Sequence, residues 1–515
     1  MFNLKKRTSR IVFVSISLLL LLIAPQIASA HGYIVRSIPQ DRAVLQHAPP
    51  RLQYWFSENL EPKFSKLTVR DQVGNVIAEG GVDSTDKSLL AVRLPSNLPN
   101  GAYVAELRTA FASDGHVVVE TRVFFVGVLI SALSDGVTVQ AVPLEVIWRV
   151  LVLSSALLLL GTFAVYAMVL VPAWGNSRYS AGLLPPRVMS RLNRIVGVAL
   201  VVAFAGNILA LLQQTMAFFD ADIGRVIGEQ LFNVVRIGTR FGDTWNARML
   251  LLILVTALFA LSIYLRGSQP RSVRAFWVAN VWGMALIVGT FSVSSHAAGS
   301  LLLPAFGIVS DWLHGLGVGF WAGGVAALAL IAPVALQPYS GDERRQALLA
   351  ALRRFTRIAA AGLAVVIATG IYSALNWITR PADVATSYGT ALILKIILVA
   401  LLVGVGAAHH AALSPDRYQR WSAVIQRVGS FMPTLRLEAL LVLLVLVAVG
   451  LLSATPIPQP DLAGQVIAPP RASQTVDGYT VRATITPGGP GINTYDVEID
   501  REGTPVDGLS VNLRM

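Results

Sequence analysis

Long apolar runs dominate the chain after about residue 145 and divide it into segments of membrane-spanning length. An α-helix needs about 20 apolar residues to cross a bilayer, and eight runs meet that requirement. Short polar loops separate them, which is typical of a multi-pass membrane protein. The expected spans are residues 146–170, 193–216, 247–265, 275–295, 306–335, 356–378, 390–412 and 434–454, which together form a membrane domain at 146–454.

Residues 31–127 follow a different pattern, in which apolar and polar residues alternate along short runs such as SKLTVRD and VVVETRVFFVG. Alternation with a period of two is typical of strands that bury one face. Turn-forming Gly, Pro, Asn and Asp separate about seven such runs. The pattern predicts a small, all-β, immunoglobulin-like sandwich, joined to the membrane domain by a linker at 128–145.

The chain changes again after the last span. A Pro-rich stretch at 455–475 indicates an extended linker. Residues 476–515 then hold three or four β-like runs, YTVRATI, NTYDVEID and LSVNLRM. So few strands bury no core of their own, so the tail either pairs with another surface or belongs to a larger, truncated domain.

The first 30 residues have the features of a secretory signal peptide. A basic start, KKRTSR, precedes a short apolar run, and ASA at 28–30 has the small-x-small form of a cleavage site. Cleavage there makes His31 the first residue of the mature chain, with a free α-amine beside its imidazole. The alternative is that the segment stays attached as an anchor.

Composition supports the membrane assignment and argues against an ordinary soluble protein, a nucleic-acid-binding protein and a phosphate-loop ATPase. The chain is 54% hydrophobic and 14% charged, values outside the range of ordinary soluble proteins. Its net charge is +12, yet the basic residues gather in the loops after the first, third, fifth and seventh spans rather than in nucleic-acid-binding patches. By the positive-inside rule those loops are cytoplasmic, so both termini are extracytoplasmic in the plasma membrane. Cysteine is absent, and no phosphate-loop motif is present.

The exported domain contains a candidate metal site. Asp114 and His116 occur in SDGH, and residues two apart on a strand leave the same face. Together with His31 they offer an amine, two imidazoles and a carboxylate. This ligand set suits Cu(II), although zinc accepts similar ligands, and SDGH on its own also fits a surface turn. No methionine lies between Met1 and Met168, which excludes a thioether Cu(I) site here.

The membrane domain also contains polar residues, which are costly in lipid and usually functional. His296 closes the fourth span, and His314 lies about 13 Å into the fifth. We expect both to relay copper, with Asp311 accepting the N–H of His314 and fixing its tautomer. The alternative is that His314 only forms an interhelical hydrogen bond. Other ionisable or histidine residues are assigned no function: Lys395, expected to snorkel to the interface, His409 and His410 at the inner end, and His47 in a loop.

The exported domain resembles the CopC family of periplasmic copper-binding sandwiches through its N-terminal histidine, the FSENLEP stretch and the SDGH run. The membrane domain resembles CopD, the usual partner of CopC, through SSHAAG and DWLHGLGVGFWAGG. The resemblance implies a CopC–CopD fusion that binds Cu(II) through His31, Asp114 and His116. Val117 and Glu120 stand where the family often has Pro and Gly, which alters the strand beyond the site.

These observations favour a non-enzymatic copper-homeostasis protein, in which the exported domain captures Cu(II) and the membrane domain mediates copper transport. The CopD resemblance implies uptake. Copper ions, the bilayer and other copper-handling proteins are the expected partners. One alternative is a transmembrane oxidoreductase with haem b, which needs two histidines at one depth, whereas His296 and His314 differ in depth. Another is a copper sensor or scavenger on a membrane anchor.

Overall fold

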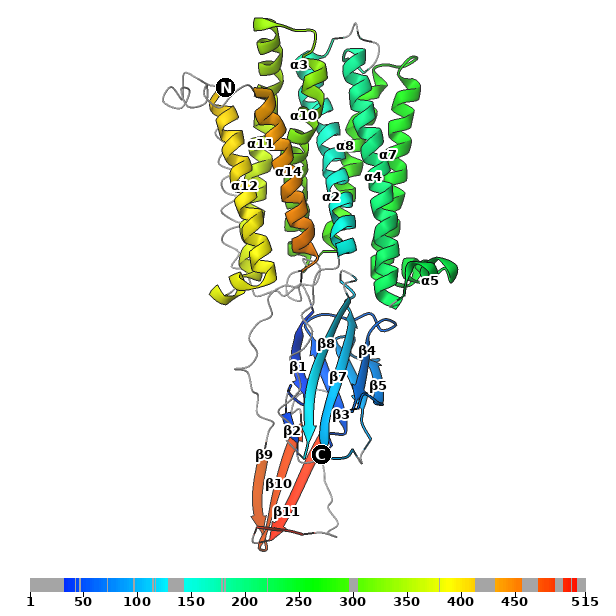
Figure 1. The fold of residues 1–515 in the computed structure, drawn as a ribbon, viewed down its shortest axis with the longest axis vertical. Helices are drawn as coiled ribbons and strands as arrows, with labels where there is room; N and C mark the ends of the chain where they lie inside the picture. Colours follow the sequence, from blue (N-terminus) through cyan, green and yellow to red (C-terminus); the bar gives the residue numbers. More distant parts are fainter. Residues whose placement is uncertain are drawn as a thin grey trace, which may run out of the picture.

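The computed structural model has a helical bundle at one end, a β domain against it, and a small sheet beyond the β domain (Figure 1). The candidate residues His31, Asp114, His116 and His296 lie outside the described part of the chain, as do the signal segment and His47. The described ranges, each with short gaps, are 32–127, 143–412, 431–455, 471–486 and 494–506.

The N-terminal β domain, called the exported domain after its predicted location, is a single sheet that curls around a core. Its strands are β1 (Ile34–Ile38), β2 (Ala43–Leu45), β3 (Arg51–Phe56), β4 (Lys66–Arg70), β5 (Val76–Val82), β6 (Leu89–Arg93), β7 (Gly101–Ala110) and β8 (Val117–Val126). They follow the order β1-β3-β6-β5-β4-β7-β8-β2. All neighbouring strands are antiparallel except the three-residue β2, which runs parallel to β8. The predicted antiparallel β domain is confirmed, and β2 adds a short parallel edge.

Alternation along the strands builds the core of this domain. Leu52, Tyr54 and Phe56 point inward from β3, and Tyr103 and Leu107 point inward from β7. Each is at most 5% exposed. Burying one such side chain stabilises the fold by about 1.5–3 kcal/mol. The alternating pattern in the sequence therefore indicates which face of each strand is buried.

The described residues contain eight helical segments long and apolar enough to cross a membrane, one for each predicted span. The helices are α2 (Pro143–Ala164), α3 (Val171–Trp174), α4 (Pro186–Phe219), α7 (Arg240–Leu265), α8 (Ser272–Val293), α9 (Pro304–Val318), α10 (Gly324–Ala335), α11 (Gly341–Trp377), α12 (Ser387–Ala412) and α14 (Phe431–Ser453). Short π-helical turns, η1 (Val165–Leu170) and η3 (Gly319–Gly323), join α2 to α3 and α9 to α10. Shorter helices lie outside the spans: α5 (Ile223–Gly228), α6 (Phe232–Gly238) and the 3₁₀ turn η4 (Pro381–Ala385).

Several helices extend beyond the predicted spans. The largest extension is in α11, which begins at Gly341 instead of residue 356, because a charged first section continues the helix outside the apolar stretch. The first helix begins at Pro143, within the expected linker. Hydrophobicity marks the part of a helix that needs lipid or protein around it, whereas the helix itself continues into polar sequence.

The first span lies at the centre of the bundle. Its most apolar window is 72% buried, compared with 11% for the seventh span. Gly161 in α2 lets η3 approach closely, because an added Cβ there would lie 2.2 Å from the carbonyl carbon of Gly323. Close backbone contact of this kind is a common way for membrane helices to associate. The centre of the bundle is therefore held by direct backbone packing.

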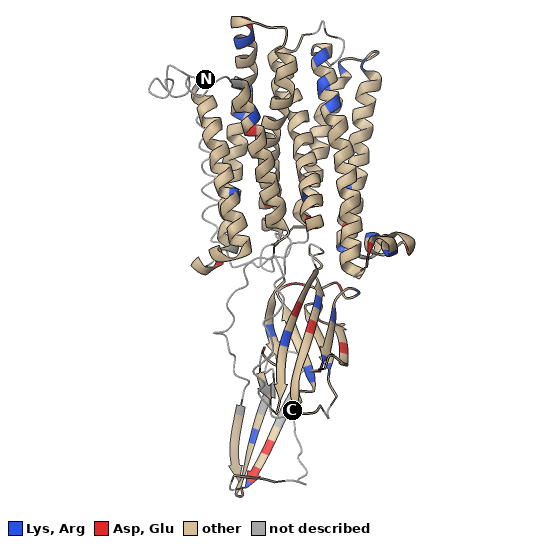
Figure 2. Cartoon of the chain, in the orientation of Figure 1, with Lys and Arg blue, Asp and Glu red and all other residues tan. Residues whose placement is uncertain are grey.

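Basic residues gather at the end of the bundle opposite the β domain (Figure 2). The first turns of α4 and α11 lie at that end and carry Arg187, Arg191, Arg344 and Arg345. Few charges occur along the middle of the helices. The bundle thus has a strongly basic end and an end covered by the β domain.

The tail forms a separate sheet with the strand order β12-β11-β10-β9. The strands are β9 (Arg471–Val476), β10 (Tyr479–Thr486), β11 (Thr494–Arg501) and β12 (Thr504–Pro505). The predicted runs YTVRATI and NTYDVEID are strands, whereas LSVNLRM lies outside the described residues. The strand β9 begins within the predicted linker. Asp477 and Gly478 both have positive φ and make a hairpin turn, so the residues before the turn pair with β10 as a strand.

Candidate functional site

A cavity of 330 Å³ lies in the half of the bundle nearest the β domain. Seven of the described long helices contribute to its walls: α2, α7, α8, α9, α11, α12 and α14. Most of the lining side chains are aliphatic or aromatic, such as Leu157, Val288 and Val445. Polar groups are few, so the ones that reach the cavity define its chemistry.

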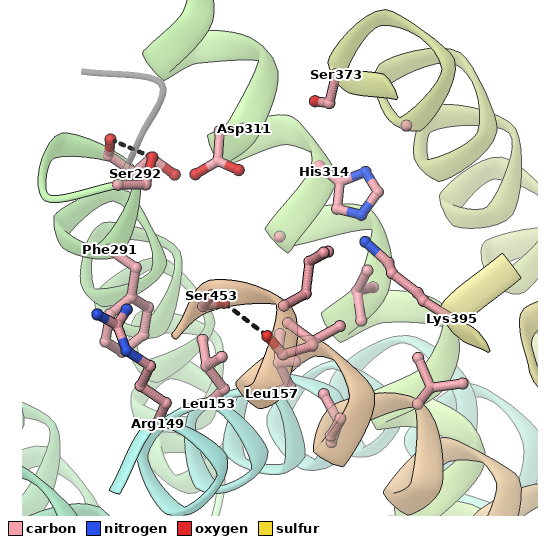
Figure 3. A pocket seen from close by; sticks show the side chains of 18 of the residues that line it. Arg149, Leu153, Leu157, Phe291, Ser292, Asp311, His314, Ser373, Lys395 and Ser453 are labelled. Carbon is pink, nitrogen blue, oxygen red and sulfur yellow. Dashed lines mark hydrogen bonds between the residues drawn. The ribbon is translucent and has the colours of Figure 1, made fainter. Parts of the chain in front are cut away.

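Among the described residues that line this cavity, the histidine is His314 (Figure 3). Its Nδ1 lies 2.9 Å from the Oγ1 of Thr369 on α11. The Thr369 hydroxyl donates its single hydrogen to the carbonyl of Val365 at 2.6 Å, so its oxygen accepts the N–H of His314. The hydrogen of the neutral imidazole is therefore on Nδ1, and Nε2 keeps a lone pair that can bind a metal.

The expected hydrogen bond from His314 to Asp311 is replaced by the bond to Thr369. Asp311 also lines the cavity, one turn earlier on α9, but its carboxylate extends toward Ser292 on α8 in Figure 3, whereas the imidazole faces α11. Within the described residues no hydrogen bond joins the two side chains. Asp311 is thus an acidic group of the cavity wall rather than the residue that orients His314.

Lys395 occupies a different place from the one predicted. Its ammonium lies inside the cavity and points toward His314, instead of extending to the interface (Figure 3). Asp311, which carries the opposite charge, lines the same cavity from α9. A lysine within a membrane bundle needs such a partner, because water cannot stabilise it there. The cavity therefore contains an imidazole, a carboxylate and an ammonium.

Two arginines also belong to the polar lining. Arg248 on α7 is 4% exposed and donates to the hydroxyl of Thr290 at 2.9 Å and to the side-chain oxygen of Asn207 at 3.3 Å. Arg149 on α2 forms a two-point ion pair with Glu145, at 2.6 and 3.0 Å. Sequence analysis did not single out Arg248, although an arginine entering an apolar run was a usable signal. Its bonds join α7 to α4 and α8.

The described neighbours of the candidate copper ligands in the exported domain lie close together. Gly32 packs so tightly on Phe111 that an added Cβ would lie 1.9 Å from the ring. Tyr33 donates its N–H to the hydroxyl of Ser57 at 3.2 Å. Gly115, between the two SDGH ligands, donates to the carbonyl of Phe111 at 2.9 Å. The residue after His31 and the turn holding Asp114 and His116 are therefore adjacent.

A carboxylate that sequence analysis missed lies at the same end of the domain. Glu58, within FSENLEP, is 4% exposed. The residue before it accepts the bond from Tyr33, and Asn59 after it accepts from the N–H of Ala112 at 3.0 Å. The available signal was an acidic residue two positions after the apolar Phe56 and two before the apolar Leu60, which places it in a stretch that the fold buries. Within the described residues no three His, Asp or Glu side chains form a metal-binding group.

His409 lies at the far end of the bundle and has two polar partners. Its Nδ1 is 3.1 Å from a carboxylate oxygen of Glu438, and its Nε2 is 2.6 Å from the hydroxyl of Thr434. Glu438 is 4% exposed, so this is a buried pair rather than the interfacial histidine that was expected. His314 and His409, both described, lie at opposite ends of the bundle and not at the single depth that two axial haem ligands need.

The fold and these sites define a multi-pass membrane protein with a polar cavity and an attached β domain. Three family models match the chain. The CopC domain matches residues 34–127, the copper resistance protein D-like N-terminal domain matches 135–301, and copper resistance protein D matches 349–452. The chain is a copper resistance or transport protein that combines CopC and CopD domains.

The chain is also similar to individual proteins. The chain is 24% identical to the copper transport protein CutJ of Bacillus subtilis over 502 residues, which is 96% of this chain and 86% of CutJ. Solved structures of CopC and PcoC are similar to about a fifth of this chain. CopC of Methylosinus trichosporium OB3b is 26% identical, with 19% of this chain and 93% of that one covered and a TM-score of 0.18. PcoC, a methionine-rich copper resistance protein of Escherichia coli, is 28% identical, with 19% and 98% covered and a TM-score of 0.17.

Proposed function

We propose that this protein takes up copper, binding Cu(II) on its exported domain and passing it into the membrane through the cavity. The observation that carries the proposal is the imidazole of His314, held by Thr369 through Nδ1 inside a cavity in the half of the bundle nearest the CopC domain. A polar site of this kind in a membrane bundle is usually part of a substrate path. CutJ, which matches nearly the whole chain, is a copper transport protein.

The ligands available in the cavity suit copper. His314 offers a ring nitrogen, and Asp311 offers a carboxylate from the same helix. Copper binds such nitrogen and oxygen ligands more tightly than the other common divalent metals do. His296, just after α8, is proposed as the next ligand toward the outside. Together these residues form the membrane part of the relay.

The orientation of the protein supports uptake from outside the cell. Basic residues at the end opposite the β domain indicate that this end faces the cytoplasm (Figure 2). The β domain and both termini are then extracytoplasmic, which requires the first 30 residues to act as a signal. Copper captured outside reaches the cavity before it reaches the basic end.

Replacing His116 by alanine is expected to weaken Cu(II) binding at the exported domain by at least about 10-fold, because the site loses an imidazole ligand. The measurement is copper titration of the purified full-length protein, followed by electron paramagnetic resonance. The parent should bind one Cu(II) at this domain. A His47→Ala variant serves as the matched control and should titrate like the parent. Equal affinity in His116→Ala and the parent would remove His116 from the site.

A further inference from the structure

The β7–β8 turn of the exported domain contacts the bundle directly. The buried amide of Gln214, near the end of α4, donates to the carbonyl of Gly115. A Cβ added to Gly115 would lie 3.1 Å from the Cβ of Phe241 on α7, and its φ of +74° also favours glycine. This turn is the one that carries the two proposed ligands, so the metal-binding end of the domain faces the bundle.

Apolar side chains from both domains form one cluster at this contact. Phe64 from the exported domain stacks on Phe218 of α4 with ring centroids 4.5 Å apart. Ala110 from β7 joins Val235 and Phe241 in the same cluster. The aromatic residues are 3–7% exposed, the values of a domain core. Packing of this kind is typical of a stable interface.

Two charged residues of the exported domain cap the ends of bundle helices. Arg108 donates to the carbonyls of Ala217 and Phe218 in the last turn of α4, where carbonyl groups lack helical partners. Glu61 accepts the N–H of Arg240, the first residue of α7, at 3.2 Å. The N-terminus of α7, which is the positive end of its dipole, thus contacts the acidic Glu61. The C-terminus of α4, which is the negative end of its dipole, contacts the basic Arg108. The charges of this surface match the two helices that it contacts.

Phe241 links this interface to the cavity. It packs against Gly115 and the apolar cluster, and it also lines the cavity together with Arg248 of the same helix. The metal-binding turn is therefore next to the wall of the cavity, on the same side of the bundle.

We propose that the exported domain stays seated on α4 and α7 while it works, and that copper passes from the β7–β8 turn into the cavity without being released to solvent. Copper moves by exchange of ligands and keeps its oxidation state in this step. This inference rests on the proposed function, since it concerns how the same metal travels between the two domains.

Cross-linking in the full-length protein tests the seating. The chain has no cysteine, so Glu61→Cys with Arg240→Cys gives a pair without background. A short bismaleimide should join the pair in most molecules, and a protease site placed within residues 128–142 should then leave the two halves linked. Copper accumulation should persist after cross-linking. Three results would overturn the proposal. The first is no linkage, and the second is linkage found only between different chains that carry one cysteine each. The third is loss of copper accumulation when the pair is linked.

Charge reversal tests the transfer. Arg108→Glu should lower the rate of copper accumulation by about tenfold, because it places an acid against the carbonyls of α4. Gln214→Leu alters the interface from the helix side and should also slow accumulation. Both should keep the parent stoichiometry of Cu(II) measured by electron paramagnetic resonance, which shows that the exported domain is folded. The matched control is Arg93→Glu, on an exposed position of β6.

The outcomes separate this inference from the proposed function. Parent rates in both interface variants, with accumulation still dependent on His314, would overturn direct transfer and leave copper transport in place. Parent rates that depend on neither the interface nor His314 would overturn both.

Discussion

Copper accumulation is expected to fall to background when His314 is replaced by leucine, while insertion and expression stay unchanged. The variant loses the Nε2 of His314. Among the described residues that line the cavity, this is the imidazole nitrogen that can bind a metal. Stability should change little, since a typical hydrogen bond between membrane helices contributes about 0.6 kcal/mol. The measurement is copper accumulation in cells or vesicles at matched protein level, together with thermal unfolding of the purified protein.

Three further variants show whether the loss comes from metal binding. Thr369→Val keeps the shape of the side chain but removes the acceptor of the His314 N–H, and should reduce accumulation by about 10–100-fold. Asp311→Asn should give a partial loss, because it removes the carboxylate from the cavity. His410→Leu changes an exposed histidine at the far end of α12 and should behave like the parent. Parent-level accumulation in a variant lacking both His296 and His314 would remove the membrane site from this account.

Adding one residue before His31 is expected to weaken Cu(II) binding at the exported domain by about 100-fold or more. The peptide bond converts the basic amine into an amide, so the site loses a ligand. Partners outside the coordination shell already contribute about 10–100-fold, and a direct ligand contributes more. The measurement compares copper titrations of the full-length protein with and without the added residue, with the amino terminus of each checked by mass spectrometry.

The pH dependence provides an independent readout of the amine. An ordinary α-amine has a pKa of about 8, so protons compete with copper for it below that pH. Copper affinity of the parent should therefore rise with pH up to about 8. The extended protein should show a shallower rise, and removal of the added residue should restore the steeper one. Equal affinity and equal pH dependence in the two proteins would show that the amine does not bind copper.

The broad architecture could be predicted because each part follows from a local pattern. All eight spans were predicted because length and hydropathy identify a membrane helix without reference to its neighbours. Alternation identified the β domain in the same way, since side chains on a strand change face at every residue. Alternation does not identify the three-residue β2, because it is too short to show the pattern and pairs with β8, about 80 residues later.

The details of the site depend on contacts between distant residues. Thr369 orients His314 from 55 residues away, and nothing in the local sequence favours it over the nearby Asp311. Lys395 was predicted to reach the interface because a lysine near a helix end usually does, but its side chain lines the cavity together with side chains from six other helices. The same applies to Arg108 and Glu61, since polar residues on a strand give no sign of the helix ends that they cap.

The mainly aliphatic wall of the cavity affects which ions can enter it. An ion that leaves water for this space gives up most of its hydration shell and receives few ligands in return. Mg²⁺ dehydrates reluctantly, and Ca²⁺ needs six to eight oxygen ligands, so both are poorly compensated there. Copper gains much more from one imidazole nitrogen and one carboxylate. Under the proposed function, a wall whose described residues include a single carboxylate disfavours the abundant hard cations, whichever ions the exported domain binds.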